Sequence, residues 1–143
     1  LVILGEEFST EMEIFKLARN YFSKEILHMG YCNSFEEYAK WLWTSDLLPV
    51  TSYQDFFGIS IMEATYCNVT PILPNRLSYP ELFPNNDSIF YSNKNELILK
   101  LKKAIEKPYK YKNINKIAAK FDWNNISIHY DKIMLKTYQN FRE

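Results

Sequence analysis

The sequence predicts an α/β fold in which a parallel sheet is flanked by helices. Short apolar runs are each followed by glycine or a hydroxyl residue, and then by a stretch with the apolar spacing of a helix. Strands that alternate with helices in this rhythm form βαβ units, whose strands are parallel. The carboxyl ends of such strands meet at one edge of the sheet, and ligands of these folds bind there.

The first half of the chain predicts two strand–helix pairs. Each strand ends at a glycine, and each helix opens with a hydroxyl residue that has Glu three positions later, the pattern of a capping box. The predicted elements are a strand over 1–4 ending at Gly5, a helix from Thr10 with Glu13, a strand over 26–29 closed by Gly30, and a helix opened by residues 34–37.

The centre of the chain, residues 51–67, reads TSYQDFFGISIMEATYC. An apolar run over 47–50 precedes it, with Pro49 expected at a strand end because proline lacks the ladder N–H. The sequence therefore predicts a strand, a loop and a helix. Gly58 lets the backbone approach a ligand where the helix begins, and the dipole there favours an anion on the amides of Gly58, Ile59 and Ser60.

Two acids, Asp55 and Glu63, flank this predicted anion site. A carboxylate does not improve an anion site, so the pair indicates another task, gripping hydroxyl groups. A site for phosphate together with a polyol is a site for a nucleotide sugar. Each acid also has a plainer interpretation, Asp55 as a loop residue or cap and Glu63 as a solvated helix residue.

The second half predicts two more strands and four helices. A strand over 71–73, a first turn at Ser78 to Glu81, a strand over 88–91, a helix capped by Asn93 and Glu96, a short helix over 114–119 and a long helix after Trp123 follow in order. We expect Phe121 and Trp123 to be buried as anchors of the last helix. We expect its far end, at Tyr138 and Phe141, to stay exposed, because an exposed apolar patch usually marks a partner.

Composition bounds the class of protein. A length of 143 residues suits one domain with its own core. Lys+Arg and Asp+Glu are 17 each, so the chain carries no electrostatic footprint for nucleic acid. No apolar run approaches the length of a membrane span, and we expect no signal peptide. Because the chain lacks a starting Met and opens inside an apolar run, we expect it to be a piece of a longer protein. We expect that protein to be cytoplasmic.

The cysteines, histidines and scattered cations carry no chemistry that the spacing can assign. Cys32 and Cys67 are too far apart for a redox pair and do not have zinc-site spacing, so buried free thiols are expected. No D-x-D metal motif occurs. Structural roles are expected for both histidines and surface positions for two cations; these four residues are His28, His129, Lys40 and Arg76.

Residues just past the predicted strands suggest a single crevice. Gly5, Gly30 and Ser52 each follow an apolar run, and the edge rule brings them together with Gly58. The overall pattern is Rossmann-like.

The stretch DFFGISIMEA resembles the E-x7-E motif of the family 4 retaining glycosyltransferases, which have the GT-B fold. Asp55 and Glu63 stand eight positions apart as in that motif, although the first acid is Asp rather than Glu. Within the family the chain is most similar to the queuosine tRNA mannosyltransferase group. The residues that carry this likeness are Leu4-Gly5-Glu6-x-Phe8, Leu27-His28-x-Gly30-Tyr31, Phe56-Phe57-Gly58, Glu63-Ala64-x-Tyr66-Cys67 and Tyr79-Pro80-Glu81-x-Phe83-Pro84.

The resemblance implies that residues 1–143 form the C-terminal, donor-binding half of a GT-B fold. The first strand of that half, its Arg and Lys phosphate loop and the N-terminal acceptor domain would precede Leu1. The donor is implied to be a nucleotide sugar, GDP-mannose, and the acceptor queuosine in tRNA, held through the acceptor domain. No metal, no other cofactor and no membrane contact are implied.

The same resemblance implies roles for individual residues. Asp55 and Glu63 would be the catalytic acids, with Asp55 on the donor sugar and Glu63 on the ribose hydroxyls. The amides of Gly58 and Ile59 would bind the pyrophosphate. The remaining substrate-binding residues would be Gly30, Tyr31 and Cys32 along the base, with Gly5, Ser52 and Phe57.

Two other functions stay open from the residues alone. One is a non-catalytic module that binds a nucleotide or a sugar phosphate; catalysis after fusion to an acceptor half would separate it from a transferase. The other is a flavodoxin-like signalling domain, which needs an acidic cluster at the strand ends that this chain lacks.

Overall fold

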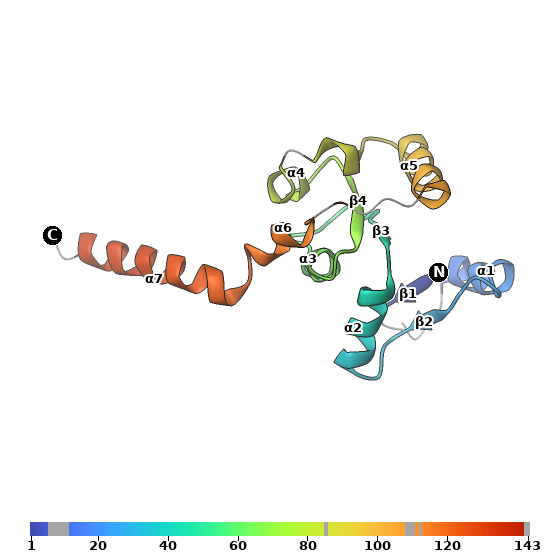
Figure 1. Ribbon diagram of the computed structural model, residues 1–143, viewed down its shortest axis with the longest axis horizontal. Coiled ribbons are helices and arrows are strands. Elements are labelled where there is room, and N and C mark those ends of the chain that lie inside the picture. The colour runs from blue at the N-terminus through green and yellow to red at the C-terminus, as the bar shows by residue number, and fades with distance from the viewer. Residues whose placement is uncertain (6–11, 85, 108–110, 112, 142–143) are drawn as a thin grey trace. The chain divides into compact units, whose positions relative to one another are not determined.

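A computed structural model describes residues 1–5, 12–84, 86–107, 111 and 113–141 (Figure 1). The chain divides into two compact units, unit 1 over Leu1–Thr44 and unit 2 over Ser45–Glu143. Both units contain parallel strands flanked by helices, which confirms the predicted α/β, Rossmann-like class. The predicted cap at Thr10 lies outside the described residues.

Unit 1 contains two strand–helix pairs. Its elements are β1 Val2–Leu4, α1 Glu13–Tyr21, β2 His28–Gly30 and α2 Phe35–Thr44. The two strands are parallel, with Val2 opposite His28 and Leu4 opposite Gly30. The N–H of Gly5 donates to the Gly30 carbonyl over 3.2 Å, so pairing continues one residue past β1.

The capping box predicted at residues 34–37 is present and opens α2. The Glu37 N–H donates to Ser34 Oγ over 3.2 Å, and the Glu37 carboxylate accepts from the Asn33 N–H over 2.9 Å. These bonds satisfy amides that the first turn of a helix leaves without intrahelical partners. β2 begins two residues later than predicted, which places His28 at its start.

Unit 2 has a three-stranded parallel sheet in the order β3-β4-β5. Pro49 is the last residue of β3, as expected for a residue without a ladder N–H. The elements are β3 Leu47–Pro49, α3 Ile59–Tyr66, β4 Thr70–Pro74, α4 Tyr79–Leu82, the 3-10 turn η1 Asp87–Ile89, β5 Phe90–Tyr91, α5 Lys94–Glu106, α6 Asn115–Ala119 and α7 Trp123–Asn140.

The core of unit 2 surrounds its central strand. All five residues of β4 are buried. Helices α3 and α6 pack together on this core, through Ile61 and Met62 of α3 and Ala118 of α6. The fully buried Tyr79 and Phe83 come from α4 and its end, so this short helix is a core element.

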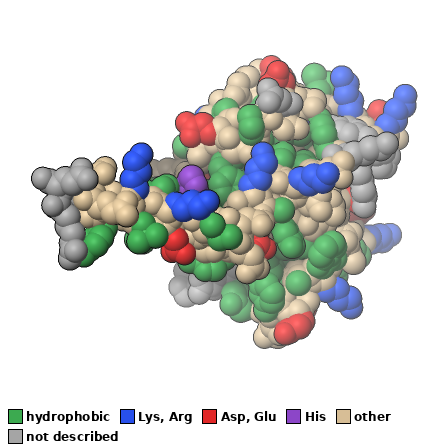
Figure 2. Space-filling model, turned by 60° about the vertical axis from the view of Figure 1, so that its left-hand side comes forward, with side chains coloured by type: hydrophobic (Ala, Val, Ile, Leu, Met, Phe, Trp, Pro, Cys, Tyr) green, Lys and Arg blue, Asp and Glu red, His purple; other side chains and the backbone are tan. Residues whose placement is uncertain are grey.

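The long helix α7 extends from unit 2 as the red ribbon of Figure 1. The expected burial of Phe121 and Trp123 is wrong, since they are 37% and 70% exposed. Trp123 is the first residue of α7 and stacks on Tyr130 of the same helix instead of entering the core. Tyr138 and Phe141 are exposed, as predicted, and hydrophobic side chains remain visible along this helix (Figure 2).

None of the described helices is both long and apolar enough to cross a lipid bilayer.

Candidate functional site

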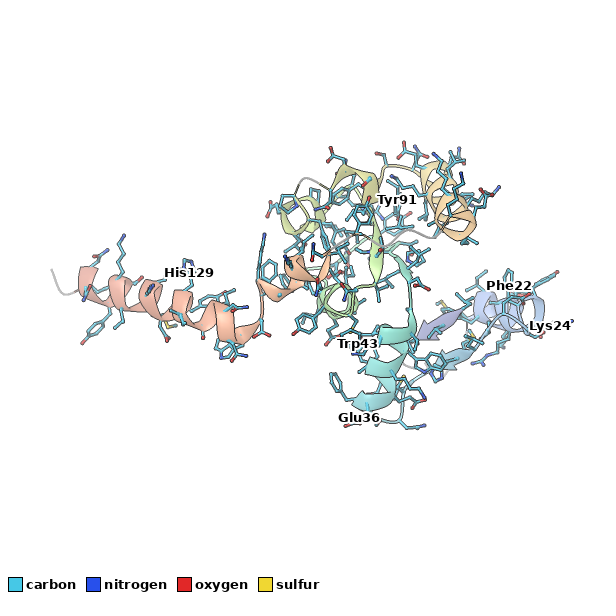
Figure 3. The ribbon with its side chains drawn as sticks, viewed as in Figure 1. Phe22, Lys24, Glu36, Trp43, Tyr91 and His129 are labelled. Carbon is cyan, nitrogen blue, oxygen red and sulfur yellow. The ribbon has the colours of Figure 1, made fainter. Side chains whose placement is uncertain are left out.

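The loop from Val50 to Gly58 is fixed to the sheet at its start. The Val50 N–H donates to the Ile72 carbonyl of β4 over 2.9 Å. The Val50 carbonyl in turn accepts from the hydroxyl of Tyr91, at the end of β5, over 2.6 Å. Figure 3 labels Tyr91 among the side chains of unit 2. The loop therefore leaves the carboxyl edge of the sheet from a buried residue that makes two hydrogen bonds, one to β4 and one to β5.

Arg76 holds the next two residues of the loop. Its guanidinium donates to the Ser52 carbonyl over 2.8 Å and 3.2 Å, and to the Thr51 carbonyl over 3.4 Å. It also lies 4.6 Å from the centre of the Tyr53 ring, in a cation–π contact. The expectation of a plain surface cation is wrong for Arg76, which is half-buried and ties residues 51–53 to the segment after β4.

Asp55 is anchored by a buried tyrosine. The Tyr79 hydroxyl donates to Asp55 Oδ2 over 2.8 Å, and the Tyr79 side chain is fully buried. Burial, followed by the hydrogen bond and charge of Asp55, raises the pKa of Tyr79 to about 12. The Ser52 side chain and the Arg76 charge act in the opposite direction on this pKa. Tyr79 is thus a neutral donor that fixes the carboxylate.

Gly58 cannot be replaced without strain. Its φ of +78° is in the left-handed region, which side chains rarely adopt. A Cβ there would lie 3.1 Å from Ile61 Cδ1, 3.3 Å from Asp55 Oδ2 and 3.5 Å from the Tyr79 ring. The structure therefore brings three predicted site residues together: Ser52, Asp55 and Gly58.

The N-terminus of α3 begins directly after this glycine. The Met62 N–H makes the first hydrogen bond of the helix, to the Gly58 carbonyl, and Gly58, the N-cap residue, has no side chain to cap the helix. The amides of Ile59, Ser60 and Ile61 therefore take no part in the ladder of the helix itself. Ile59 and Ser60 are exposed, so this positively polarised end faces solvent.

Glu63 lies one turn into α3 and is half-buried. Burial of the Cys67 thiol raises its pKa, and the charge of Glu63 raises this pKa further. Its predicted contact with ribose hydroxyls stays a prediction.

Phe57 packs against the core of unit 2. It is half-buried against the core cluster, and its ring lies 5.2 Å from the Phe121 ring in an edge-to-face pair. Edge-to-face packing is a favoured aromatic geometry. The contact gives Phe57 a packing role beside its predicted place in the substrate site.

In unit 1 the predicted site residues differ in exposure. Gly5 and Gly30 are hydrogen-bonded neighbours, and Tyr31 is 73% exposed. Cys32 is buried, with its Sγ 3.9 Å from His28 Nε2. Burial and the nearby Glu37 raise the pKa of the Cys32 thiol. Gly5 and Gly30 belong to unit 1, and Ser52 and Gly58 to unit 2. The single crevice expected from these four residues stays a prediction.

Unit 2 contains a pocket of about 250 Å³ that the sequence analysis did not predict. Asn75 and Ser92, which directly follow β4 and β5, contribute to it, so it opens at the carboxyl edge of the sheet. Ligands of such folds bind where parallel strands end, which is why Ser52 was predicted as a site residue. The same rule applied to β4 and β5 predicts Asn75 and Ser92. The lining residues are Asn75, Pro80, Phe83, Asp87, Phe90 and Ser92.

The chain is similar in sequence to known glycosyltransferases. The tRNA-queuosine alpha-mannosyltransferase of Drosophila melanogaster is 34% identical to the chain over 101 residues. The match covers 71% of this chain and 26% of that protein, so the chain spans about a quarter of the length of this relative. The sequence model of the family described as glycosyl transferases group 1 matches residues 1–121. The chain therefore belongs to the glycosyl transferases group 1 family.

Proposed function

We propose that the chain binds a nucleoside diphosphate sugar for a retaining glycosyl transfer of the family 4 type, with mannose from GDP-mannose as the group passed to queuosine in tRNA. The observation that carries this proposal is the uncapped N-terminus of α3 beside the tyrosine-anchored Asp55. The resemblance to the queuosine mannosyltransferase group, together with the Drosophila relative, supports the choice of sugar and acceptor.

In this proposal, the amides of Gly58 and Ile59 bind the pyrophosphate. An uncapped helix start offers both N–H donors and a favourable dipole to an anion. As the sugar leaves, negative charge builds on the pyrophosphate, and donors already in place stabilise that charge without reorganising.

Asp55 and Glu63 bind hydroxyl groups of the donor. Tyr79 occupies Oδ2 of Asp55, and Oδ1 accepts from a hydroxyl of the sugar. The Asp55 carboxylate lies close to Gly58 at the start of α3, so the shorter Asp, where the family motif has Glu, reaches a sugar bound there. Glu63 accepts from the ribose hydroxyls.

Unit 1 contributes the residues for the base. The exposed Tyr31 ring stacks on the base, with the backbone of Gly30 and Cys32 along its edge, and Gly5 leaves room for the donor. The Cys32 side chain is turned toward His28 and takes no part in this contact. The present chain has a formal net charge of zero, so we place tRNA binding on an N-terminal acceptor domain. The whole protein acts in the cytoplasm.

Calorimetry with GDP and GDP-mannose tests the assignment of the two acids. A hydrogen bond to a charged group contributes roughly 1.5–3 kcal/mol, so Glu63→Gln should weaken GDP binding by at least about tenfold. Asp55→Asn should leave GDP binding nearly unchanged and weaken GDP-mannose binding. Glu106→Gln, at the exposed end of α5, is the matched control. Equal losses of GDP affinity in both variants would refute the roles.

A second measurement separates transfer from mere binding. The chain alone should show no sugar transfer, and fusion to an acceptor half of the same family should restore it. A fusion that binds GDP-mannose and tRNA but transfers no mannose would leave the chain a nucleotide-sugar-binding module.

A further inference from the structure

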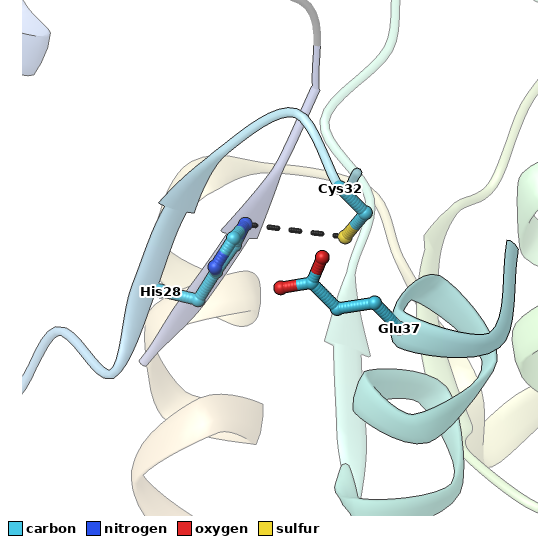
Figure 4. A group of neighbouring side chains, drawn as sticks. All are labelled: His28, Cys32 and Glu37. Atoms are coloured by element: carbon cyan, nitrogen blue, oxygen red, sulfur yellow. Dashed lines mark hydrogen bonds between the residues drawn. The ribbon is translucent and has the colours of Figure 1, made fainter. Parts of the chain in front are cut away.

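Three side chains with metal-ligand atoms point toward one another in unit 1. They are His28 at the start of β2, Cys32 in the following loop and Glu37 in the first turn of α2 (Figure 4). One ligand atom from each lies within 4.8 Å of the others. Imidazole nitrogen, thiolate sulfur and carboxylate oxygen are the donors that protein zinc sites use.

The sulfur and nitrogen atoms of the cluster are spaced nearly as a tetrahedral ion requires. Zinc binds sulfur at about 2.3 Å and imidazole nitrogen at about 2.0–2.1 Å, which places two such ligands roughly 3.5 Å apart. The Cys32 Sγ and His28 Nε2 lie 3.9 Å apart. A movement of a few tenths of an ångström, within the range of side-chain torsions, brings the two atoms onto one ion.

The surroundings already orient two of the ligands. The Asn33 N–H holds Glu37 Oε2, so the carboxylate faces the cluster while its Oε1 can bind an ion. The His28 ring lies 5.4 Å from the Trp41 ring, which limits its rotation. Metal-ligating carboxylates and imidazoles in proteins are generally held by such outer contacts.

The cluster is also local in the chain. All three ligands come from residues 28–37, so closing the chelate costs little chain entropy. None of them depends on unit 2. His28 Nε2 is 3.3 Å from the Gly30 carbonyl, a long contact that binding of an ion at this nitrogen would replace.

We propose that His28, Cys32 and Glu37 bind one Zn²⁺ ion, with water in the fourth position. Binding transfers the thiol proton to solvent and joins the start of β2 to the first turn of α2. The proposal departs from the expectation of no metal, and it is independent of donor binding at α3. A mixed sulfur, nitrogen and oxygen set favours zinc over magnesium or calcium.

Cobalt substitution gives the first test. After treatment with a chelator, the 143-residue chain is titrated with Co²⁺, which reports thiolate ligation by a charge-transfer band in the near ultraviolet. We expect this band, together with the visible bands of tetrahedral cobalt, and their loss on adding one equivalent of Zn²⁺. Absence of the thiolate band in the unaltered chain overturns the proposal without the use of any variant.

Matched variants give the second test, by competition for Zn²⁺ against a chromophoric chelator. Cys32→Ser, His28→Gln and Glu37→Gln should each weaken zinc binding by at least about tenfold. Glu37→Gln keeps an amide oxygen for the Asn33 N–H, so α2 retains its cap. The controls are Cys67→Ser, His129→Gln and Glu36→Gln, and Figure 3 labels His129 and Glu36. Losses as large in the controls as in the three proposed ligands refute the site.

Discussion

The Tyr79 hydroxyl donates a 2.8 Å hydrogen bond to Asp55 Oδ2, joining the first residue of α4 to the loop before α3. The donor is fully buried and the acceptor is half-buried. A carboxylate fixed in this way presents its other oxygen in one direction. The bond thus links the core of unit 2 to the acid that the proposed function places on the donor sugar.

Tyr79→Phe removes this hydrogen bond while keeping the buried ring. A hydrogen bond to a charged group contributes roughly 1.5–3 kcal/mol, so we expect the free energy of unfolding to fall by about that amount. GDP-mannose affinity should fall as well, because Asp55 loses its anchor. Urea denaturation and calorimetry measure the two effects. Tyr53→Phe, at an 84% exposed tyrosine, is the control and should change stability little.

Alkaline pH should destabilise the protein through Tyr79. Its pKa is about 12 in the folded chain and near 10 when unfolded, so between these values the unfolded state loses a proton that the folded state keeps. Stability is fully present below pH 10 and falls as pH rises toward 12, by about 3 kcal/mol for a shift of this size. Urea midpoints at pH 9 to 11.5 should fall less steeply in Tyr79→Phe than in the unaltered chain; parallel curves would contradict the prediction.

Gly58→Ala should destabilise unit 2. The left-handed backbone costs a non-glycine residue roughly 1–2 kcal/mol, and the added methyl group would press on Ile61 and Asp55. Gly5→Ala is the matched control, since a Cβ there meets nothing within 4 Å. Unfolding free energies of the two variants provide the comparison. A Gly58→Ala chain as stable as Gly5→Ala would show that the loop relaxes at no cost.

Arg76→Lys should loosen the loop at residues 51–53. Lysine keeps the charge but cannot reproduce the forked donation to the Ser52 carbonyl or the flat contact with Tyr53. We expect a loss of about 1–2 kcal/mol and faster amide exchange at residues 51–53. Lys40→Arg, at an exposed cation of α2, should change neither quantity. Unaltered exchange in Arg76→Lys would show that its bonds do not order the loop.

Local sequence signals predicted the element order well. Ser34 and Asn93 were recognised as helix caps because their hydrogen bonds reach only three residues along the chain. Pro49 was placed at a strand end for an equally local reason, its missing N–H. The sequence did not predict features that depend on packing in the folded chain. Phe121 and Trp123 were expected in the core, but only the folded chain shows that Trp123 stacks along its own helix.

The candidate site divides in the same way. Asp55, Gly58 and Glu63 could be chosen by type and spacing. Their supports, Arg76 and Tyr79, could not, because each contacts the loop from 24 residues away. The cluster of His28, Cys32 and Glu37 was also missed, since its spacing matches no established zinc pattern and only β2 and α2 bring the ligands together.

The hydrogen bond from Tyr91 to the Val50 carbonyl has a consequence for protein engineering. It spans 41 residues, and the bonds from Arg76 and Tyr79 to the same loop span 24. A graft of residues 50–66 onto another scaffold would transfer the motif and leave behind the three side chains that shape it. Recombination between homologues should therefore keep residues 50–91 as one block, with crossover points placed before β3 or after β5.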